Sequence, residues 1–326
     1  MPDPVAVDRL EVLVLLDNTT DSLSTNPPNV ATEWSRFWTS GRLRPVSGRD
    51  TCCAHHGLAL LITAHRGTES RSMLFDAGPE GATFLRNCGV LEVDLGGVDA
   101  VVLSHGHWDH AGGLVDALRA IASRRSGAGV PCYVHPGMFA ERGMLRPTGE
   151  IFPLERIPGV DELAAAGAHV ISTREPQLAG DGMFFVSGEI PRSTPYEAGL
   201  PGQMRRPAQD GDWIPDPLLI DERFVSVHLR DKGQFVFSAC SHAGIVNVLR
   251  HARATFPAVP LFGAMGGMHL SGVNERIIPQ TVGDLERFSL KLLAPGHCTG
   301  WRALSAMAAV FGDELVPSAV GKRYIL

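Results

Sequence analysis

Short apolar runs alternate with segments of helical periodicity along the first half of the chain. Four brief aliphatic or β-branched runs, each ended by Asp, Gly or His, predict buried strands at residues 12–16, 58–63, 72–75 and 100–103. Two segments, 80–88 and 113–123, have the apolar spacing of helices, and the second places Leu114, Leu118 and Ile121 on one face. We therefore predict a first sheet covered by two helices.

The second half repeats this pattern. It predicts strands at 184–186, 224–229, 234–238, 260–263 and 291–294, with helices at 243–255, 274–288 and 301–311. This order favours an α/β fold in which two sheets lie between helices over one continuous parallel sheet. The length of 326 residues fits one large domain spanning residues 1–326.

Two long segments fit neither pattern. Residues 17–54 are polar and rich in Ser, Thr and Asn, and residues 188–217 are rich in proline and carry Arg192, Arg205 and Arg206. Long irregular segments inside a domain are often functional, although surface loops also vary without consequence. We predict that both are irregular insertions.

Composition and charge exclude several classes of protein. The chain is 44% hydrophobic and 20% charged, so it is not disordered, and its net charge of −6 gives no basic surface for nucleic acid. No apolar run approaches the roughly 18 residues that span a membrane. The N-terminus has no secretory pattern, and the six cysteines form no CxxC pair. These observations predict a cytoplasmic protein with reduced cysteines and no membrane or nucleic-acid partner.

One segment concentrates groups that can bind metal. After the predicted strand at 100–103 comes Ser104-His105-Gly106-His107-Trp108-Asp109-His110-Ala111-Gly112-Gly113. Three imidazoles and a carboxylate within six positions, where a strand ends and a helix begins, can converge on a metal ion. Residues two apart in an extended segment project to one side, so His105 and His107 would form one group while Asp109 and His110 turn toward a second position.

This segment resembles the His-x-His-x-Asp-His signature of the metallo-β-lactamase superfamily. The resemblance implies an αββα sandwich of two mixed sheets flanked by helices. It also implies that Asp76, in Phe75-Asp76-Ala77-Gly78, is a buried group behind the metal ligands. A turn Asp before Gly is the ordinary alternative for that residue.

The same resemblance implies further ligands from the second half. His297, in Pro295-Gly296-His297, would join Asp109 and His110, and His242 would join His105 and His107. Cys240 stands where many relatives carry a bridging Asp. A thiolate can ligate zinc, but a buried Cys is more often a small hydrophobe. One or two Zn²⁺ ions per chain are therefore expected.

Further motifs narrow the resemblance to the branch typified by the dihydropterin-ribofuranosyl-aminobenzene phosphate synthases, which also contains a zinc-dependent dehalogenase acting on chlorothalonil. These motifs are Leu16-Asp17-Asn18-Thr19, His56-Gly57-Leu58, Gly188-Glu189-Ile190-Pro191-Arg192, Cys240-Ser241-His242 and Gly266-Gly267-Met268-His269-Leu270. The resemblance implies pocket roles for five residues: Asn18, Trp108, Glu189, Arg192 and His269. The alternative for the loop residues among them is a hydrogen bond to the backbone.

The expected activity follows from the metal. Zinc with an open position lowers the pKa of bound water from about 15.7 toward about 7, so we expect a zinc hydrolase with Asp109 and His269 as catalytic residues. The resemblance to this branch implies a small aromatic or heteroaromatic substrate, with hydrolytic dehalogenation as the most specific version. A broad apolar pocket would suit it, with Phe184, Phe185, Trp213 and Met268 as candidate lining residues or core.

Other interpretations stay open. The first alternative is a phosphate-handling enzyme of the pterin-synthase type, with Arg192, Arg205 and Arg206 holding the phosphate. The second is a ligand-binding protein without turnover. A homodimer is possible, and two further groups of residues have no assigned role: the Cys52-Cys53-Ala54-His55-His56 run, which could bind another ion, and His135.

Overall fold

Alternating side chains of the central strands divide the apolar residues between two faces. In the computed structural model, which describes residues 3–39, 45–125, 129–207 and 211–326, strand β1 (Arg9–Leu16) turns Val12 and Val14 to one face and Leu13 and Leu15 to the other. Period-two alternation of this kind, apolar on both faces, is expected of a strand covered on both sides. The sequence of β1 therefore places its sheet in the middle of the molecule.

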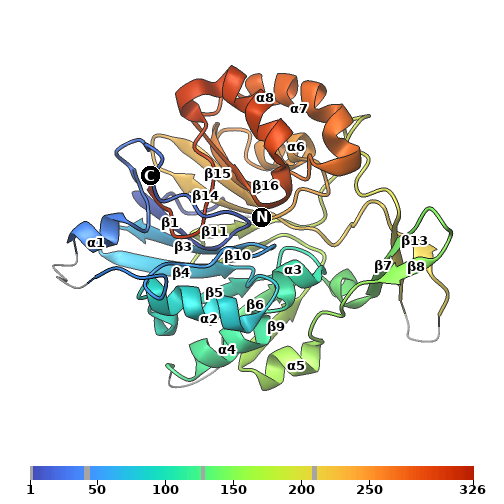
Figure 1. Ribbon diagram of the computed structural model, residues 1–326, viewed down its shortest axis with the longest axis horizontal. Helices are drawn as coiled ribbons and strands as arrows, with labels where there is room; N and C mark the ends of the chain where they lie inside the picture. Colours follow the sequence, from blue (N-terminus) through green and yellow to red (C-terminus); the bar gives the residue numbers. More distant parts are fainter. Residues whose placement is uncertain (1–2, 40–44, 126–128, 208–210) are drawn as a thin grey trace.

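The strands form two large mixed sheets (Figure 1). The first has the order β2 (Val30–Ala31), β18 (Arg323–Ile325), β1, β3 (Ala59–Arg66), β4 (Glu69–Phe75), β5 (Ala100–Val102), β6 (Val130–Val134) and β9 (Ala168–Ser172). The second has the order β10 (Gln177–Ala179), β11 (Phe184–Val186), β14 (Val225–Leu229), β15 (Gly233–Ser238), β16 (Leu261–Gly267) and β17 (Leu292–Gly296). Strands β4, β5, β6 and β9 run parallel, as do β15, β16 and β17.

Three apolar layers hold the sheets and helices together. The inner faces of the two sheets pack against each other through residues such as Ile62, Phe75, Phe235 and Phe237. The outer face of the first sheet is covered by α2 (Gly81–Val90), α4 (Leu114–Ala122) and α5 (Val160–Ala165), and that of the second by α6 (Ile245–Thr255), α7 (Ile278–Glu286) and α8 (Trp301–Phe311). Each fully buried Val, Leu, Ile or Phe contributes about 1.5–3 kcal/mol to this packing. The predicted αββα sandwich is confirmed.

A smaller sheet projects beside the sandwich. Strands β7 (Glu141–Leu145) and β8 (Ile151–Pro153) pair with β12 (Gln203–Arg206) and β13 (Ile214–Pro215), at the right of Figure 1. The segment 188–217, predicted to be irregular, thus contains two short strands, while 17–54 contains β2 and the short helix α1 (Ser35–Thr39). These strands escaped prediction because they are two to five residues long and have polar or exposed faces.

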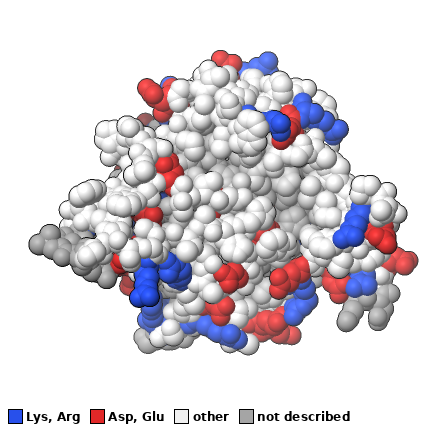
Figure 2. All heavy atoms as spheres, in the orientation of Figure 1, with Lys and Arg blue, Asp and Glu red and all other residues white. Residues whose placement is uncertain are grey.

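Each strand and helix predicted for the sandwich has an observed counterpart, but β9, β10, β18 and α5 were not predicted. The predicted helix at 274–288 starts later than expected, because a 3₁₀ turn at Gly272–Ile277 precedes α7 and Pro279 lies in its first turn. No helix of the described residues combines the length and apolar composition needed to cross a membrane. On the face seen in Figure 2, basic and acidic side chains are interspersed around the rim. The three layers leave the ends of the parallel strands free to carry loops.

Candidate metal centre

The His-rich segment spans the loop after β5, with His105 and His107, and the short helix α3 (Trp108–Ala111), with Asp109 and His110. Gly106 is needed in this loop because a Cβ atom there would lie 2.2 Å from the carbonyl oxygen of Met138. The Gly106 N–H donates to Oδ2 of buried Asp221 at 2.9 Å, and Asp221 also accepts from Arg142 at 2.7 Å. The backbone between the two histidines is therefore fixed by a buried ion pair.

A first triad, defined by His105, His107 and His242, consists of imidazoles alone. Their ligand-capable nitrogens all lie within 4.8 Å of one another, and Nε2 of His105 is 3.0 Å from Nδ1 of His107. His242 comes from the loop after β15, where its N–H and that of Ala243 donate to the Glu222 carboxylate. Nε2 of His107 and both ring nitrogens of His242 are buried without a hydrogen-bond partner among the described residues.

A second triad, defined by Asp109, His110 and His297, includes a carboxylate. Oδ2 of Asp109 lies 3.7 Å from Nε2 of His110 and 3.5 Å from Nε2 of His297. Both Nε2 atoms are buried, and within the described part of the chain neither has a hydrogen-bond partner. His56 extends this group, since its Nε2 is 3.4 Å from Oδ2 of Asp109 and its side chain is 55% exposed.

Hydrogen bonds from outside the triads orient three of these rings. Nδ1 of His110 is 2.7 Å from the Asp76 carboxylate, Nδ1 of His297 is 2.9 Å from Oδ1 of Asn18, and Nδ1 of His105 is 2.9 Å from Oγ of Ser104. Metal-binding histidines typically have their second nitrogen held in this way, which aims the first at the ion. The implied position of Asp76 behind the triad agrees with this geometry.

Strained backbone marks the ends of the strands that carry the site. Asp76 after β4, Ser241 after β15, His269 after β16 and His297 after β17 all have positive φ, between 44° and 61°. Such conformations cost about 1–3 kcal/mol each for residues other than Gly, and they persist where the surrounding structure holds them. The four loops therefore adopt unfavourable backbone conformations, and these conformations direct their side chains toward one place.

The charges of the triads differ. Burial, together with the charge of His110, lowers the pKa of His105 well below 6.5, and burial lowers the pKa of His107 to about 3. Burial also acts to lower the pKa of His110, but the carboxylates of Asp109 and Asp76 raise it to about 9. Neutral imidazoles are ready ligands, and a proton-binding histidine between two carboxylates marks a place that favours positive charge.

Together these observations fit a divalent metal ion. The unpartnered nitrogens are costly unless something occupies them, and nitrogen and carboxylate donors at convergent positions are the set that zinc uses. Cys240 lies between the triads, since its sulfur is grouped with His105 and His110 and also with His297. Cys240 and His269 complete a further group with His242.

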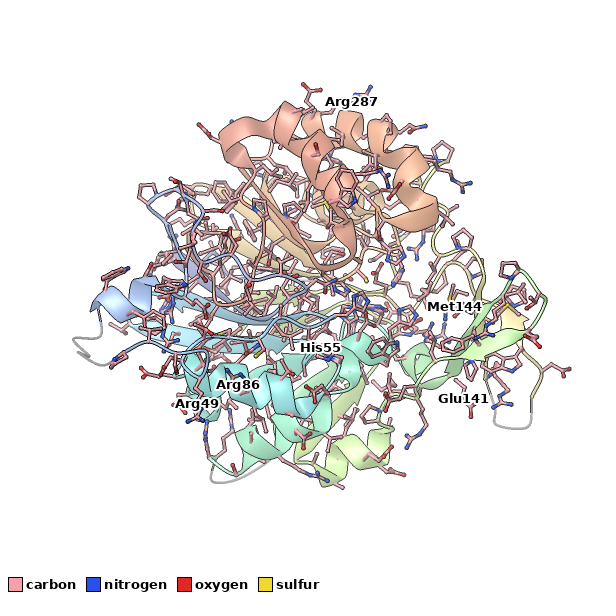
Figure 3. The ribbon with its side chains drawn as sticks, viewed as in Figure 1. Arg49, His55, Arg86, Glu141, Met144 and Arg287 are labelled. Carbon is pink, nitrogen blue, oxygen red and sulfur yellow. The ribbon has the colours of Figure 1, made fainter. Side chains whose placement is uncertain are left out.

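A pocket of about 390 Å³ opens onto both triads. Asn18, Trp108 and His269, three of the five expected pocket residues, line it together with Cys240, and the structure adds these residues: His56, Met144, Leu154, Leu200, Gln203, Ser271 and Cys298. Figure 3 labels Met144 on the side of the small sheet. A larger cavity of about 730 Å³ lies beside α2, near Arg49 and Arg86 in Figure 3, but the triads do not line it. We therefore place the functional site at the smaller pocket.

Several sequence candidates lie outside this pocket. Glu189 accepts from Arg174 at 3.0 Å and contacts the His135 ring at 3.2 Å, and Arg192 donates to backbone carbonyl groups of Ile190 and Leu218. Arg206 pairs with Glu141. Trp213 lies under the Arg206 guanidinium, 5.1 Å from it, whereas Phe184, Phe185 and Met268 belong to the buried core. The implied pocket roles of Glu189 and Arg192 therefore do not match their contacts.

The run from Cys52 to His56 does not form one metal site. Cys52 is buried with its N–H bonded to Glu33, Cys53 is exposed and accepts a hydrogen bond from Arg86, and only His56 reaches the triads. Sequence reasoning gave no site role to Asp17, Ser104, Asp221 or Cys298, although Asp17 accepts from the His297 N–H at 2.8 Å. Asp17 and Ser104 lie inside quoted motifs and Cys298 adjoins His297, which was an available signal, whereas Asp221 is distant in sequence from the loop that it anchors.

Comparisons with known proteins agree with the fold and the branch. Residues 71–158 match the family described as the beta-lactamase superfamily domain. The chain is 24% identical over 270 residues to the 7,8-dihydropterin-6-methyl-4-(β-D-ribofuranosyl)-aminobenzene-5′-phosphate synthase of Methanocaldococcus jannaschii, covering 82% of this chain and 89% of that protein. An uncharacterised protein of the same organism is 28% identical over 275 residues, covering 82% of this chain and 93% of the relative.

Solved structures share the whole fold. One described as a metal-dependent hydrolase of the beta-lactamase superfamily aligns with a TM-score of 0.70 at 20% identity, covering 96% of this chain and 98% of that chain. Unliganded yeast PDE1 aligns with a TM-score of 0.53 at 11% identity, covering 99% of this chain and 100% of that chain. The metallo-β-lactamase fold and the resemblance to the pterin-synthase branch are thus confirmed.

The functional expectation needs correction. A zinc hydrolase of small aromatic compounds, and hydrolytic dehalogenation of chlorothalonil in particular, was the wrong main interpretation, because the named curated relative is a synthase of a phosphorylated pterin compound. The alternative of a phosphate-handling, pterin-synthase-type enzyme is better supported. The coarser expectation, a metallo-β-lactamase fold that brings His and Asp donors together, is confirmed.

Proposed function

We propose that this protein is a metal-dependent enzyme of the pterin-synthase type that binds a phosphorylated substrate with an aromatic or heteroaromatic ring. The observation that carries the proposal is the pair of triads, with unpartnered buried nitrogens, beneath a pocket with apolar walls. Similarity over 82% of the chain to a synthase whose product contains a pterin, an aminobenzene and a 5′-phosphate supports this substrate class.

Zinc is the metal that we propose. His105, His107 and His242 would hold one ion, and Asp109, His110 and His297 would hold a second. Bound there, the ions would supply Lewis-acid polarisation of a phosphoryl oxygen. The donors of the two triads, three imidazoles in the first and two imidazoles with one carboxylate in the second, are typical of zinc sites.

Different residues of the pocket would bind the ring and the phosphate of the substrate. Met144, Leu154 and Leu200 offer apolar surface to a flat ring, with the Trp108 indole at the motif. Arg192 contacts backbone carbonyl groups, Arg205 lies 3.8 Å from Asp216 and Arg206 pairs with Glu141, and none of the three lines the pocket. We therefore assign phosphate binding to imidazoles that line the pocket. The exposed His56 ring, held 3.0 Å from the Asn18 side-chain amide through Nδ1, is the main candidate.

A comparison of ligands that differ by one phosphate tests this proposal. Isothermal titration of the zinc-loaded protein with ribose 5-phosphate and with ribose should show binding of the phosphate ester at least about tenfold tighter, a difference of about 1.4 kcal/mol. His56→Ala should reduce this preference, while His169→Ala, at an exposed position on β9, should leave it unchanged. Equal affinity for the two sugars would overturn the proposal.

A further inference from the structure

Two cysteine sulfurs face each other beside the second triad. Sγ of Cys240 and Sγ of Cys298 are 3.2 Å apart, and both residues are buried but line the pocket. Each follows a strand of the parallel set by two residues, Cys240 after β15 and Cys298 after β17, so the pair spans the end of the intervening strand β16. The carboxyl ends of neighbouring parallel strands are the usual place for ligand groups.

The chain makes room for this pair at specific positions. A Cβ atom on Gly267, the last residue of β16, would lie 2.7 Å from Sγ of Cys298, so glycine at this position clears space for the sulfur. His297 has φ of 47°, which departs from the extended backbone in which successive side chains project to opposite sides. As a result, His297 and Cys298 both line the pocket despite being adjacent.

The groups around the two sulfurs are those expected around metal ligands. Sγ of Cys240, a ring nitrogen of His297 and Sγ of Cys298 all lie within 4.8 Å of one another. The backbone N–H of His269 donates to Sγ of Cys298 at 3.3 Å. Hydrogen bonds of this kind to sulfur are characteristic of thiolates that serve as metal ligands. The simple packing role of a buried cysteine does not account for two sulfurs that share a pocket wall with His297.

We propose that Cys240 and Cys298 are both sulfur ligands at the His297 side of the metal centre, and that they make this position selective for zinc over manganese or magnesium. The inference deepens the proposed function and rests on its metal centre. Soft thiolates prefer zinc, whereas carboxylate and water sites suit the harder ions. Each thiol releases one proton to solvent as its sulfur–metal bond forms, so no oxidant or reductant is needed.

Cobalt substitution tests the sulfur ligands directly. The metal-free full chain, loaded with Co²⁺, should show an intense near-ultraviolet absorption band from thiolate-to-cobalt charge transfer. Cys298→Ser should lower this band by about half, and the Cys240→Ser/Cys298→Ser double variant should abolish it, because each thiolate is one donor. Cys132→Ala, which changes a buried cysteine on β6 that belongs to neither the pocket lining nor a candidate metal group, is the matched control and should retain the band.

A second measurement covers variants that fail to fold. In the unmodified chain, bound zinc should protect Cys240 and Cys298 from alkylation by iodoacetamide, as read by mass spectrometry, relative to the metal-free chain. Co²⁺ bound in stoichiometric amount without the near-ultraviolet band, an unchanged band in Cys298→Ser, or a disulfide joining the two cysteines in the zinc-loaded protein would each overturn the inference. Both readouts are independent of substrate, so a failure of the phosphate preference would leave them intact.

Discussion

The two triads occupy the same pocket but are held in place in different ways. In the first, carboxylates act on the backbone: Asp221 accepts from the N–H of Gly106, and Glu222 accepts from the N–H of His242, while Ser104 contacts one ring, that of His105. In the second, side chains act on two rings, with Asp76 on His110 and Asn18 on His297, and Asp17 accepts from the N–H of His297. The first triad therefore depends more on the fold of its loops, and the second more on hydrogen bonds to its rings.

The difference has an electrostatic counterpart. The first triad consists of neutral imidazoles whose pKa values are lowered by burial, whereas the second surrounds His110 with carboxylates that raise its pKa to about 9. A cation is thus already favoured at the second triad by the protein's own charges. At the first triad, a cation is held by donor atoms alone. Substitutions of the ligands, of the residues that hold the backbone and of the residues that hold the rings should therefore affect the two triads differently.

The largest effect is expected from removing a ligand of the first triad. His107→Ala leaves two imidazoles there, and because no carboxylate assists them, we expect this position to lose its metal. Elemental analysis of protein purified without added metal should show a fall relative to the parent, with His169→Ala as the surface control. Unchanged metal content in His107→Ala would mean that the first triad is not a metal site.

Removing a backbone anchor should affect stability more than metal chemistry. Asp221→Ala leaves the Arg142 guanidinium, whose side chain is 2% exposed, with the Asp216 carboxylate at 3.2 Å and the Gly137 carbonyl at 3.4 Å as partners. Breaking a buried pair costs about 3–5 kcal/mol, and we expect the lower end because Asp216 remains. Urea unfolding measures the loss, and Asp216→Ala should cost less. A variant as stable as the parent would show that Asp221 does not anchor the loop.

The pH dependence of the metal-free protein should report the second triad. The pKa of His110 is about 9 in the folded chain against 6.5 otherwise. Its contribution, about 3 kcal/mol, is fully present below pH 6.5 and is lost as the pH rises through 9. Metal binding has the opposite sign, because the proton must leave His110, so affinity there should rise up to about pH 9.

Asp76→Asn provides the control for this pH dependence. It removes one of the two carboxylates that raise the pKa of His110, so unfolding of the metal-free variant should vary less between pH 6.5 and 9 than that of the parent. The chemical shifts of the His110 ring, followed by NMR, give the pKa directly. A pKa near 6.5 in the parent would remove the electrostatic distinction between the triads.

How well the sequence predicts each triad depends on how far apart its residues lie along the chain. The contiguous segment from His105 to His110 is enough to predict that its donor groups lie close together, because the end of a strand and the start of a helix bring neighbouring residues together. His242 and His297 needed family resemblance, since each comes from a different strand. Asp221 was missed because its role depends on packing between distant loops. Cys298 directly follows the predicted ligand His297, but only the structure shows that its sulfur lies beside that of Cys240. Conversely, Glu189 and Arg192 lie in a recognisable motif, but ion pairs and backbone carbonyls take up their side chains.

The smallest effect is expected from the neutral ring partner. Asn18 accepts from Nδ1 of His297 at 2.9 Å and from the Gly57 N–H at 3.0 Å, so Asn18→Ala should free the ring without changing any charge. Loss of such a partner costs about 10–100-fold in metal affinity, and an uncharged amide should lie at the lower end. Chelator competition for zinc measures this, with Asn29→Ala, at an exposed position, as the control. The chemical shifts of the His297 ring should change in Asn18→Ala, while those of His105 should not. If instead the first triad lost affinity equally, the two triads would behave as one coupled centre, and the contrast between backbone-anchored and ring-anchored ligands would not hold.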